Sequence, residues 1–102
     1  MNDDMLAVIG EYATILTSDQ YDLAIAAYDW DNEGFTADEV AKWAQAKCFD
    51  AMCARQLQRA GVSPELAATL TDAGQGEYAD TIGYKYANGD LTLTEAAALA
   101  DA

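Results

Sequence analysis

The sequence TADEVAKWAQAKCFDAMCARQLQRAG, residues 36–61, decides how the rest of the chain can pack. Thr36 followed three residues later by Glu39 is a capping box, which marks the first turn of a helix. No glycine or proline then occurs before Gly61, a residue type that commonly ends a helix. The pattern predicts one long helix over about 37–60, which would span about 36 Å at 1.5 Å per residue. Its expected apolar stripe consists of Trp43, Ala46, Phe49, Cys53, Leu57 and Ala60.

Helical periodicity also dominates the sequence on both sides of this segment. Towards the N-terminus it predicts a helix over about 3–16 and another over about 19–28, with Ser18 as the N-cap of the second. Ser63-Pro64-Glu65 is typical of the start of a further helix. A chain of 102 residues has the size of one domain. We therefore expect a single all-α domain over 1–102, a small bundle of four to six helices around the long one.

Two structures compete for residues 78–94. Asn88-Gly89, with alternating apolar residues on both sides, is typical of a β-hairpin turn. The same pair can end a helix over about 78–87, and Thr92 with Glu95 forms a second capping box for a last helix. The alanine-rich sequence after Glu95 has no strand character, so we favour two helices over the C-terminal hairpin.

Charge is distributed unevenly along the chain. Eighteen Asp and Glu residues against five Lys and Arg residues give a formal net charge of −13. Four of the five cations fall within residues 42–60. Residues 1–41 contain no Lys or Arg and ten acids: Asp3, Asp4, Glu11, Asp19, Asp22, Asp29, Asp31, Glu33, Asp38 and Glu39. We expect the N-terminal region to present a negative surface.

This charge balance excludes two classes of partner. Direct binding of nucleic-acid phosphates needs Lys and Arg in numbers, and a polybasic membrane anchor needs a basic cluster, so we expect neither. No run of about 18 apolar residues occurs that would span a bilayer. The N-terminus, Met1-Asn2-Asp3-Asp4, is acidic where a secretory signal is basic. We therefore expect a cytoplasmic protein.

The residue types of most catalytic sites are missing. The chain has no histidine, so it has neither a Ser–His nor a Cys–His couple. Cys48 and Cys53 would lie about 140° apart around the expected long helix, which does not suit a disulfide. They also lack the further Cys or His ligands that a zinc site needs. We expect no enzyme and no cofactor.

An acidic surface without a catalytic set of residues favours a stoichiometric binding protein. Such a surface can imitate the phosphate rows of a nucleic acid and occupy the basic groove of a nucleic-acid-binding protein or complex. In size and charge alone, the chain is similar to the inhibitors that phages and mobile elements direct against host defence nucleases, including anti-CRISPR proteins. The resemblance implies that the partner is blocked by charge mimicry. The nearby aromatic residues Trp30 and Tyr28 are candidate anchors. The expected partner-binding residues are Asp19, Asp22, Asp29, Asp31 and Glu33.

The acidic composition is also compatible with roles that need no basic partner. Acids can simply keep a monomer soluble, and many Asp with few Lys suit a high-salt cytoplasm. Alternatively, the protein is a small helical interaction or scaffold module, oligomeric through the apolar side of the long helix.

A calcium site is a further alternative. The sequence Asp29-Trp30-Asp31-Asn32-Glu33-Gly34 resembles the first half of an EF-hand loop, with oxygen ligands at positions 1, 3 and 5 and glycine at position 6. Position 12 is Val40 instead of glutamate, and Glu39 stands one residue early. The resemblance implies at most a degenerate calcium site on Asp29, Asp31, Glu33 and Glu39. The competing interpretation is an Asp-rich turn between two helices, with Gly34 at a positive φ.

Overall fold

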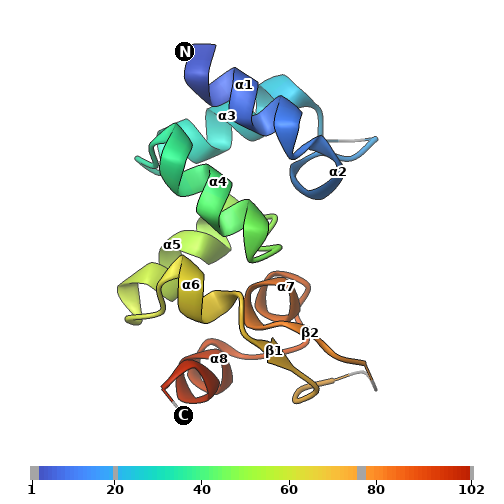
Figure 1. The fold of residues 1–102 in the computed structure, drawn as a ribbon, viewed down its shortest axis with the longest axis vertical. Coiled ribbons are helices and arrows are strands. Elements are labelled where there is room, and N and C mark those ends of the chain that lie inside the picture. Colours follow the sequence, from blue (N-terminus) through green and yellow to red (C-terminus); the bar gives the residue numbers. More distant parts are fainter. Residues whose placement is uncertain (1–2, 20, 76–77, 102) are drawn as a thin grey trace.

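The computed structural model describes residues 3–19, 21–75 and 78–101, so Met1 and Asn2 of the acidic N-terminus lie outside it. Within these residues, eight helices and one pair of short strands are stacked along a long axis, with overall dimensions of 37 × 26 × 16 Å (Figure 1). The all-α prediction is confirmed, although the helices are shorter and more numerous than expected. The helices nearest the N-terminus are α1 (Asp3–Glu11), α2 (Ala13–Leu16), α3 (Leu23–Asn32) and α4 (Ala37–Gln45).

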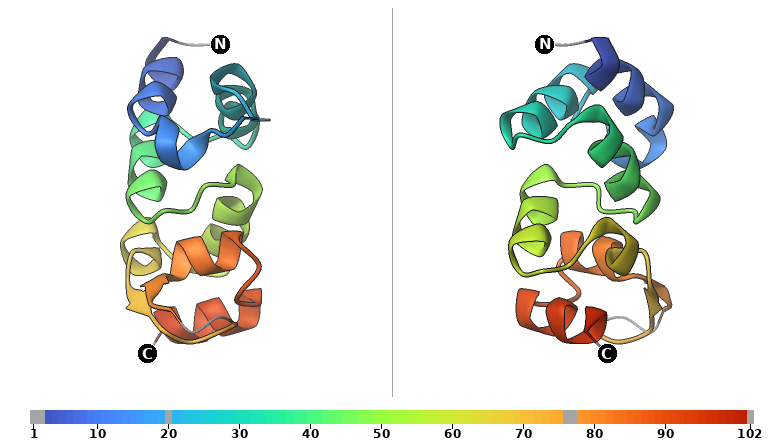
Figure 2. Two further views of the ribbon diagram at one scale, coloured as in Figure 1. Left: turned by 90° about the vertical axis from the view of Figure 1, so that its right-hand side faces the viewer. Right: turned by 60° about the vertical axis from the view of Figure 1, so that its left-hand side comes forward.

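The C-terminal elements form the opposite end of the stack (Figures 1 and 2). Strands β1 (Leu70–Thr71) and β2 (Asp80–Thr81) pair antiparallel, with Leu70 opposite Thr81. The helices here are α5 (Ala51–Arg59), α6 (Pro64–Ala67), α7 (Ile82–Ala87) and α8 (Leu93–Ala100). Residues 82–100 thus contain the two helices that we favoured, and Asn88-Gly89 does not form a hairpin turn.

The prediction of a long helix over 37–60 is wrong, because the chain turns between α4 and α5. Lys47 adopts a left-handed conformation with φ 59°, and the Cys48 backbone N–H donates to the carbonyl of Trp43 at 3.1 Å. This is a Schellman ending without glycine. The carbonyl of Ala46, which a continuous helix would bond to residue 50, instead accepts a hydrogen bond from Thr81 Oγ1 at 2.5 Å. Tertiary contacts therefore replace the helical bonds that the break removes.

Two N-terminal boundaries also differ from the prediction. The helix expected over 3–16 is divided into α1 and α2. The helix expected to start after Ser18 starts at Leu23, because the side chain of Asp22 accepts the Ile25 N–H at 3.0 Å and caps it. Ser18 instead forms a β-bridge with Tyr21. Helix α3 then continues to Asn32, so the expected Asp-rich loop at residues 29–34 is largely helical.

Three of the four side-chain caps expected from the sequence are confirmed, and Ser18 is the exception. Both capping boxes are complete, at Thr36 with Glu39 and at Thr92 with Glu95. Ser63 caps α6, whose first residue is Pro64. Each such cap contributes about 1 kcal/mol of helix stability.

The core runs through the middle of the stack. Trp30 and Trp43 are completely buried and both pack against Phe35, with ring centroids 5.1 and 6.4 Å from it. Trp30 is therefore part of the core and cannot anchor a partner at the surface. Ala46 and Leu57 are also completely buried, so most of the apolar side proposed for oligomerisation is used inside the molecule.

In the described part of the chain, no helix combines the length and apolar character needed to cross a bilayer.

Candidate binding surface

The expected partner-binding acids lie on α3 and in the connection that precedes it. Asp19 is exposed in this connection, and Asp31 is exposed on the helix. Asp22 is exposed but its carboxylate caps the helix. Asp29 and Glu33 are half-buried and stand one helical turn apart. The structure thus separates three exposed acids, on α3 or just before it, from two half-buried acids that line a hollow beside the helix.

The outer surface of α3 exposes apolar side chains between carboxylates. Ile25 is 46% exposed and Tyr28 is 59% exposed. At 100° per residue, Asp31 lies about 60° beyond Tyr28 on one side, and Asp29 lies about 40° beyond Ile25 on the other. We call the surface formed by Asp22, Ile25, Tyr28 and Asp31 the α3 face. It has the composition of an interface centre with a charged rim.

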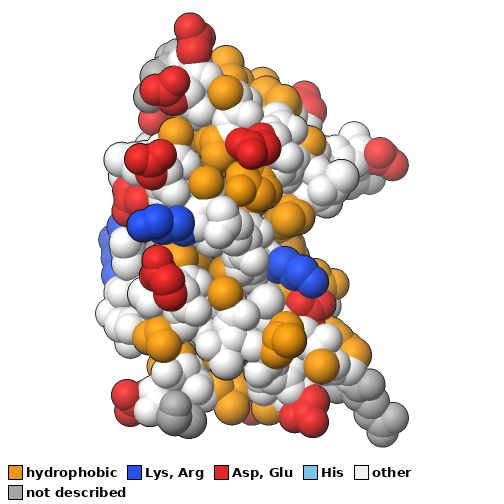
Figure 3. Space-filling model, viewed as in Figure 1, with side chains coloured by type: hydrophobic (Ala, Val, Ile, Leu, Met, Phe, Trp, Pro, Cys, Tyr) orange, Lys and Arg blue, Asp and Glu red, His pale blue; other side chains and the backbone are white. Residues whose placement is uncertain are grey.

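The hollow beside the α3 face lies where the two ends of the molecule meet. The space-filling view is indented at the level of the α4–α5 connection, between α2 and α7 (Figure 3). Here a cavity of about 320 Å³ is lined by residues of α2, α3 and this connection. Its main apolar lining residues are Ile15, Leu16 and Phe49, and its polar ones include Tyr21, Asp29 and Asp50.

A second hollow adjoins the first. It measures about 220 Å³ and is lined by Asn32, Glu33 and Met52 among others, and it shares Asp29 and Asp50 with its neighbour. We call the two hollows together the acidic groove. The two hollows therefore share two carboxylates, with an apolar wall in the first hollow and a mostly polar lining in the second.

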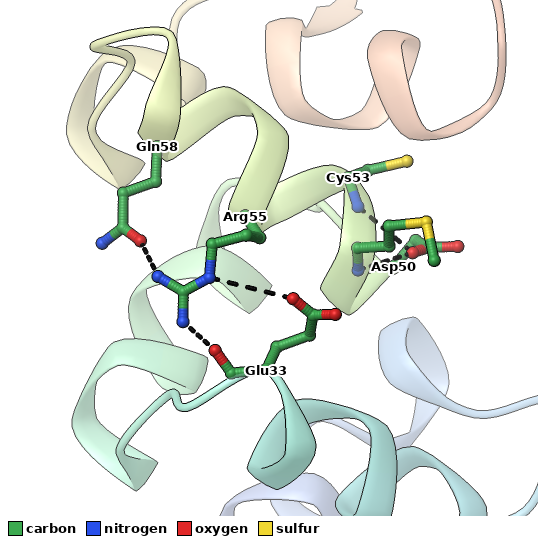
Figure 4. Close-up of polar contacts among 6 residues, drawn as sticks. Glu33, Asp50, Cys53, Arg55 and Gln58 are labelled. Atoms are coloured by element: carbon green, nitrogen blue, oxygen red, sulfur yellow. Dashed lines mark hydrogen bonds and ion pairs between the residues drawn. The ribbon is translucent and has the colours of Figure 1, made fainter.

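Local hydrogen bonds hold the two central carboxylates in place. Asp29 Oδ2 accepts the hydroxyl of Tyr21. Asp50 Oδ1 accepts the N–H groups of Met52 at 2.8 Å and Cys53 at 3.2 Å, which caps α5 (Figure 4). One oxygen of each carboxylate is thereby fixed. Among the described residues, the other oxygens, Asp29 Oδ1 and Asp50 Oδ2, have no hydrogen-bond donor.

The groove also has a negative potential. Burial raises the pKa of the Tyr21 phenol, and the hydrogen bond to Asp29 and the charges of Asp29 and Asp50 raise that pKa further. Ionisation of Tyr21 is therefore disfavoured there, first by burial and then by the neighbouring carboxylates.

Arg55 is the guanidinium closest to this region, and it is fully used by the fold. It donates to the backbone carbonyl of Glu33 and to the side chain of Gln58, and its Nε lies 3.8 Å from the Glu33 carboxylate (Figure 4). The same guanidinium lies 4.5 Å from the centroid of the Phe35 ring. Arg55 therefore joins the end of α3 to α5 and neutralises Glu33 alone.

The lysines that make contacts are directed elsewhere. Lys42 and Lys47 lie 4.0 and 3.4 Å from Glu65 and Asp80, respectively. Lys85 is completely buried, with its Nζ donating to the carbonyl of Ala73 at 2.7 Å. Within the described residues, Glu33 is thus the only acid of the N-terminal region that lies within 4.0 Å of a Lys or Arg.

The geometry provides no ligand set for calcium. Because residues 29–32 are helical, their side chains diverge around α3 and do not converge as in an EF-hand loop. The carboxylate of Glu39 is bonded to the Thr36 N–H at 2.9 Å in the capping box. No group of three or more metal-ligating Cys, Asp or Glu side chains occurs in the part of the chain that the structure describes. Gly34 does have the expected positive φ, 85°.

The cysteines are free and poorly reactive. Cys48 is buried in the α4–α5 connection, outside any helix, and Cys53 is half-buried in α5. Burial raises the pKa of both thiols, with the charge of Asp50 adding to the shift of Cys53, whose pKa rises to about 11. The raised pKa lowers the fraction of reactive thiolate at neutral pH for both residues.

A larger hollow of about 510 Å³ lies between the α5–α6 region and α8. Its walls are mainly short apolar side chains, including Ala60, Val62 and Ala97, with Asp101 at one side. This lining offers little with which to orient a polar ligand.

Sequence reasoning missed three residues of the groove: Tyr21, Phe49 and Asp50. Asp50 is the only acid within residues 42–60, and its position after Cys48-Phe49 matches an N-cap. The uninterrupted helical pattern of residues 37–60 hides that signal.

Comparison of the chain with protein-family models, with curated proteins and with solved structures finds no match. Its function must therefore be inferred from its own side chains.

Proposed function

We propose that the protein is a stoichiometric binding protein that engages a basic groove on a protein partner through the α3 face and the acids around it. The observation that carries this proposal is the absence of internal cations near these acids. Among the described residues, only Glu33 of the N-terminal acids lies within 4.0 Å of a Lys or Arg. The negative charge of the other N-terminal acids remains available to an external partner.

The exposed apolar residues support binding over mere solubility. A purely solubilising surface has no need for Tyr28 at 59% and Ile25 at 46% exposure on the same helix. Tyrosine is enriched among the residues that contribute most to protein interfaces. Carboxylates around such a centre would accelerate association with a basic partner and favour the correct orientation.

A nucleic-acid-binding protein or complex is the proposed partner, because its basic groove is already shaped for rows of negative charge. Successive turns of α3 repeat at about 5.4 Å, whereas phosphates along one DNA strand repeat at about 3.4 Å of helix axis. The proposed mimicry is therefore one of charge density and not of exact spacing. The protein would then act as the inhibitors of defence nucleases do, by occupying the site where nucleic acid binds.

The test compares the wild type with a triple variant, Asp19→Asn, Asp22→Asn and Asp31→Asn. Asparagine at position 22 keeps the helix cap, so the variant changes charge and little else. Each tagged protein is incubated with a nuclease-treated lysate of the source organism and eluted with a salt gradient. We expect a partner that the wild type retains at low salt and releases at moderate salt, and that the variant does not retain. Added DNA or RNA should displace this partner.

Two results would contradict the proposal. Equal retention of the same proteins by wild type and variant would show that these carboxylates do not bind the partner. A partner that stays bound at high salt and ignores added nucleic acid would indicate a hydrophobic interaction module instead.

A further inference from the structure

We propose that the acidic groove is an anchor pocket for one arginine side chain of the partner, carried by an extended basic segment. This inference rests on the proposed function and specifies the chemistry that the partner presents next to the α3 face.

The first argument is the size and lining of the groove. A volume of about 320 Å³ with an adjoining hollow of about 220 Å³ admits a side chain with its backbone, but not a helix. Ile15, Leu16 and Phe49 provide an apolar wall for the aliphatic stem of the arginine. The ring of Phe49 is held in position by an edge contact with Tyr84, with centroids 5.9 Å apart.

The second argument is charge complementarity. Asp29 and Asp50 line both hollows, and each has one oxygen fixed by a bond within the protein and one without a donor among the described residues. In that part of the chain, no Lys or Arg lies within 4.0 Å of either carboxylate. A guanidinium has several donors in one plane and can serve both oxygens together.

The third argument is that the molecule already places a guanidinium between an aromatic ring and a carboxylate beside the groove, and the groove is lined by the same residue types. Arg55 lies over the ring of Phe35 while it contacts the carboxylate of Glu33. The groove repeats this combination of aromatic ring and carboxylate with Phe49, Asp29 and Asp50, but without a cation. Arginine is favoured over lysine because its planar head can stack on a ring and bond to carboxylates at the same time.

The experiment is an NMR titration of the full ¹⁵N-labelled chain with the peptide acetyl-Gly-Arg-Gly-amide. Acetyl-Gly-citrulline-Gly-amide, which is similar in shape but uncharged, and acetyl-Gly-Lys-Gly-amide are titrated in parallel. We expect saturable shifts of the Tyr21, Phe49 and Asp50 amides with the arginine peptide, weaker binding of the lysine peptide and no binding of the citrulline peptide.

Charge variants locate the site. Asp29→Asn and Asp50→Asn keep the acceptor oxygen that bonds to Tyr21 or caps α5, so both variants should retain the wild-type fold. We expect each to weaken arginine binding about fivefold, which corresponds to about 1 kcal/mol for a partly exposed charge pair. Asp72→Asn, the same change at an exposed aspartate that lies outside both the groove and the α3 face, is the matched control and should bind as the wild type does.

Three outcomes would overturn the inference. Equal weakening by Asp72→Asn would show diffuse attraction to the whole acidic surface. Equal binding of the citrulline peptide would show a pocket that ignores charge, and equal binding of the lysine peptide would remove the preference for a guanidinium. The titration contains no partner, so its failure can be distinguished from a failure of the proposed function. If the arginine peptide does not bind but a partner is captured in a salt-sensitive way, this inference fails and the proposed function stands. If the peptide binds but no such partner is captured, the proposed function fails.

Discussion

The two ends of the molecule treat charge in opposite ways. At the end formed by α1–α3, carboxylates are abundant and exposed, and where they form bonds in the described residues these are mostly local, such as the cap of Asp22. At the end formed by α5–α8, the fold engages Arg55 and Lys85, and Lys85 is fully buried. Arg55 joins the two ends by holding the carbonyl of Glu33.

This difference shows which charges stabilise the structure and which are available for other uses. A buried cation needs compensating acceptors, so its removal leaves acceptor groups unsatisfied or a cavity. An exposed carboxylate surrounded by like charges contributes little to stability and can even reduce it. We therefore expect mutations of the buried Lys85 and the half-buried Arg55 to destabilise the protein and neutralisation of the outer acids to leave it folded.

The largest effect should follow from truncating Lys85. Lys85→Ala removes a completely buried side chain, its bond to the Ala73 carbonyl and its contact with the Tyr78 ring, 4.4 Å from Nζ. We expect a loss of about 3 kcal/mol in the free energy of unfolding, measured with urea. Lys42→Ala is the matched control. Because Lys42 and Glu65 are 59% and 68% exposed at the side chain, its effect should stay within about 0.5 kcal/mol. Similar losses for both lysines would contradict the contrast between buried and exposed cations.

A smaller loss should follow from breaking the connection between the two ends. Arg55→Ala removes the donors to the Glu33 carbonyl and Gln58 and the cation–π contact with Phe35. We expect a loss of about 2 kcal/mol in the free energy of unfolding. Arg59→Ala on the same helix changes an exposed residue and should be nearly neutral. If Arg55→Ala were equally neutral, Arg55 would not join the two ends energetically.

The sequence predicted the helix starts better than the helix ends. The side chains of Thr36, Ser63 and Thr92 act on the backbone two or three residues away, so their role is visible locally. The break at Lys47 was not visible, because a lysine in the left-handed region costs about 1–2 kcal/mol and is chosen only when distant contacts offset it. The bond from Thr81 to Ala46 spans 35 residues and is such a contact.

The candidate site also depends on contacts between distant residues, which a local sequence pattern does not show. The excess of acids was evident from composition, and Asp19 and Asp31 are exposed as expected. The groove, however, depends on the α4–α5 connection, which brings Phe49 and Asp50 next to Asp29. No local sequence pattern shows that Phe49 and Asp50 lie next to Asp29, because residues 37–60 have the pattern of a continuous helix.

The half-buried thiol of Cys53 on α5 should also react differently from an exposed thiol. Burial and the charge of Asp50 raise the pKa of Cys53 to about 11, so Cys53 keeps its proton in the folded state where an unfolded thiol loses it at about pH 8.5. The stability from this thiol is present below that pH and is lost as the pH rises towards 11. The alkylation rate of Cys53 with iodoacetamide should accordingly reach its midpoint near pH 11, with Cys53→Ser as the blank. A midpoint near pH 8.5 would show that the thiol is not sheltered.

The smallest change in stability should follow from neutralising the outer acids. This change most directly tests the central claim, that the fold does not use these carboxylates. The measurement is urea unfolding of the wild type and of the triple variant Asp19→Asn, Asp22→Asn and Asp31→Asn, from about 10 mM to about 1 M NaCl, where the screening length falls from about 30 to about 3 Å. If these carboxylates are unpaired and repel one another, the variant will be at least as stable as the wild type at low salt, and the wild type will gain more from added salt. A loss of about 2 kcal/mol in the variant at low salt would contradict this account, because it would show that the fold itself uses these acids.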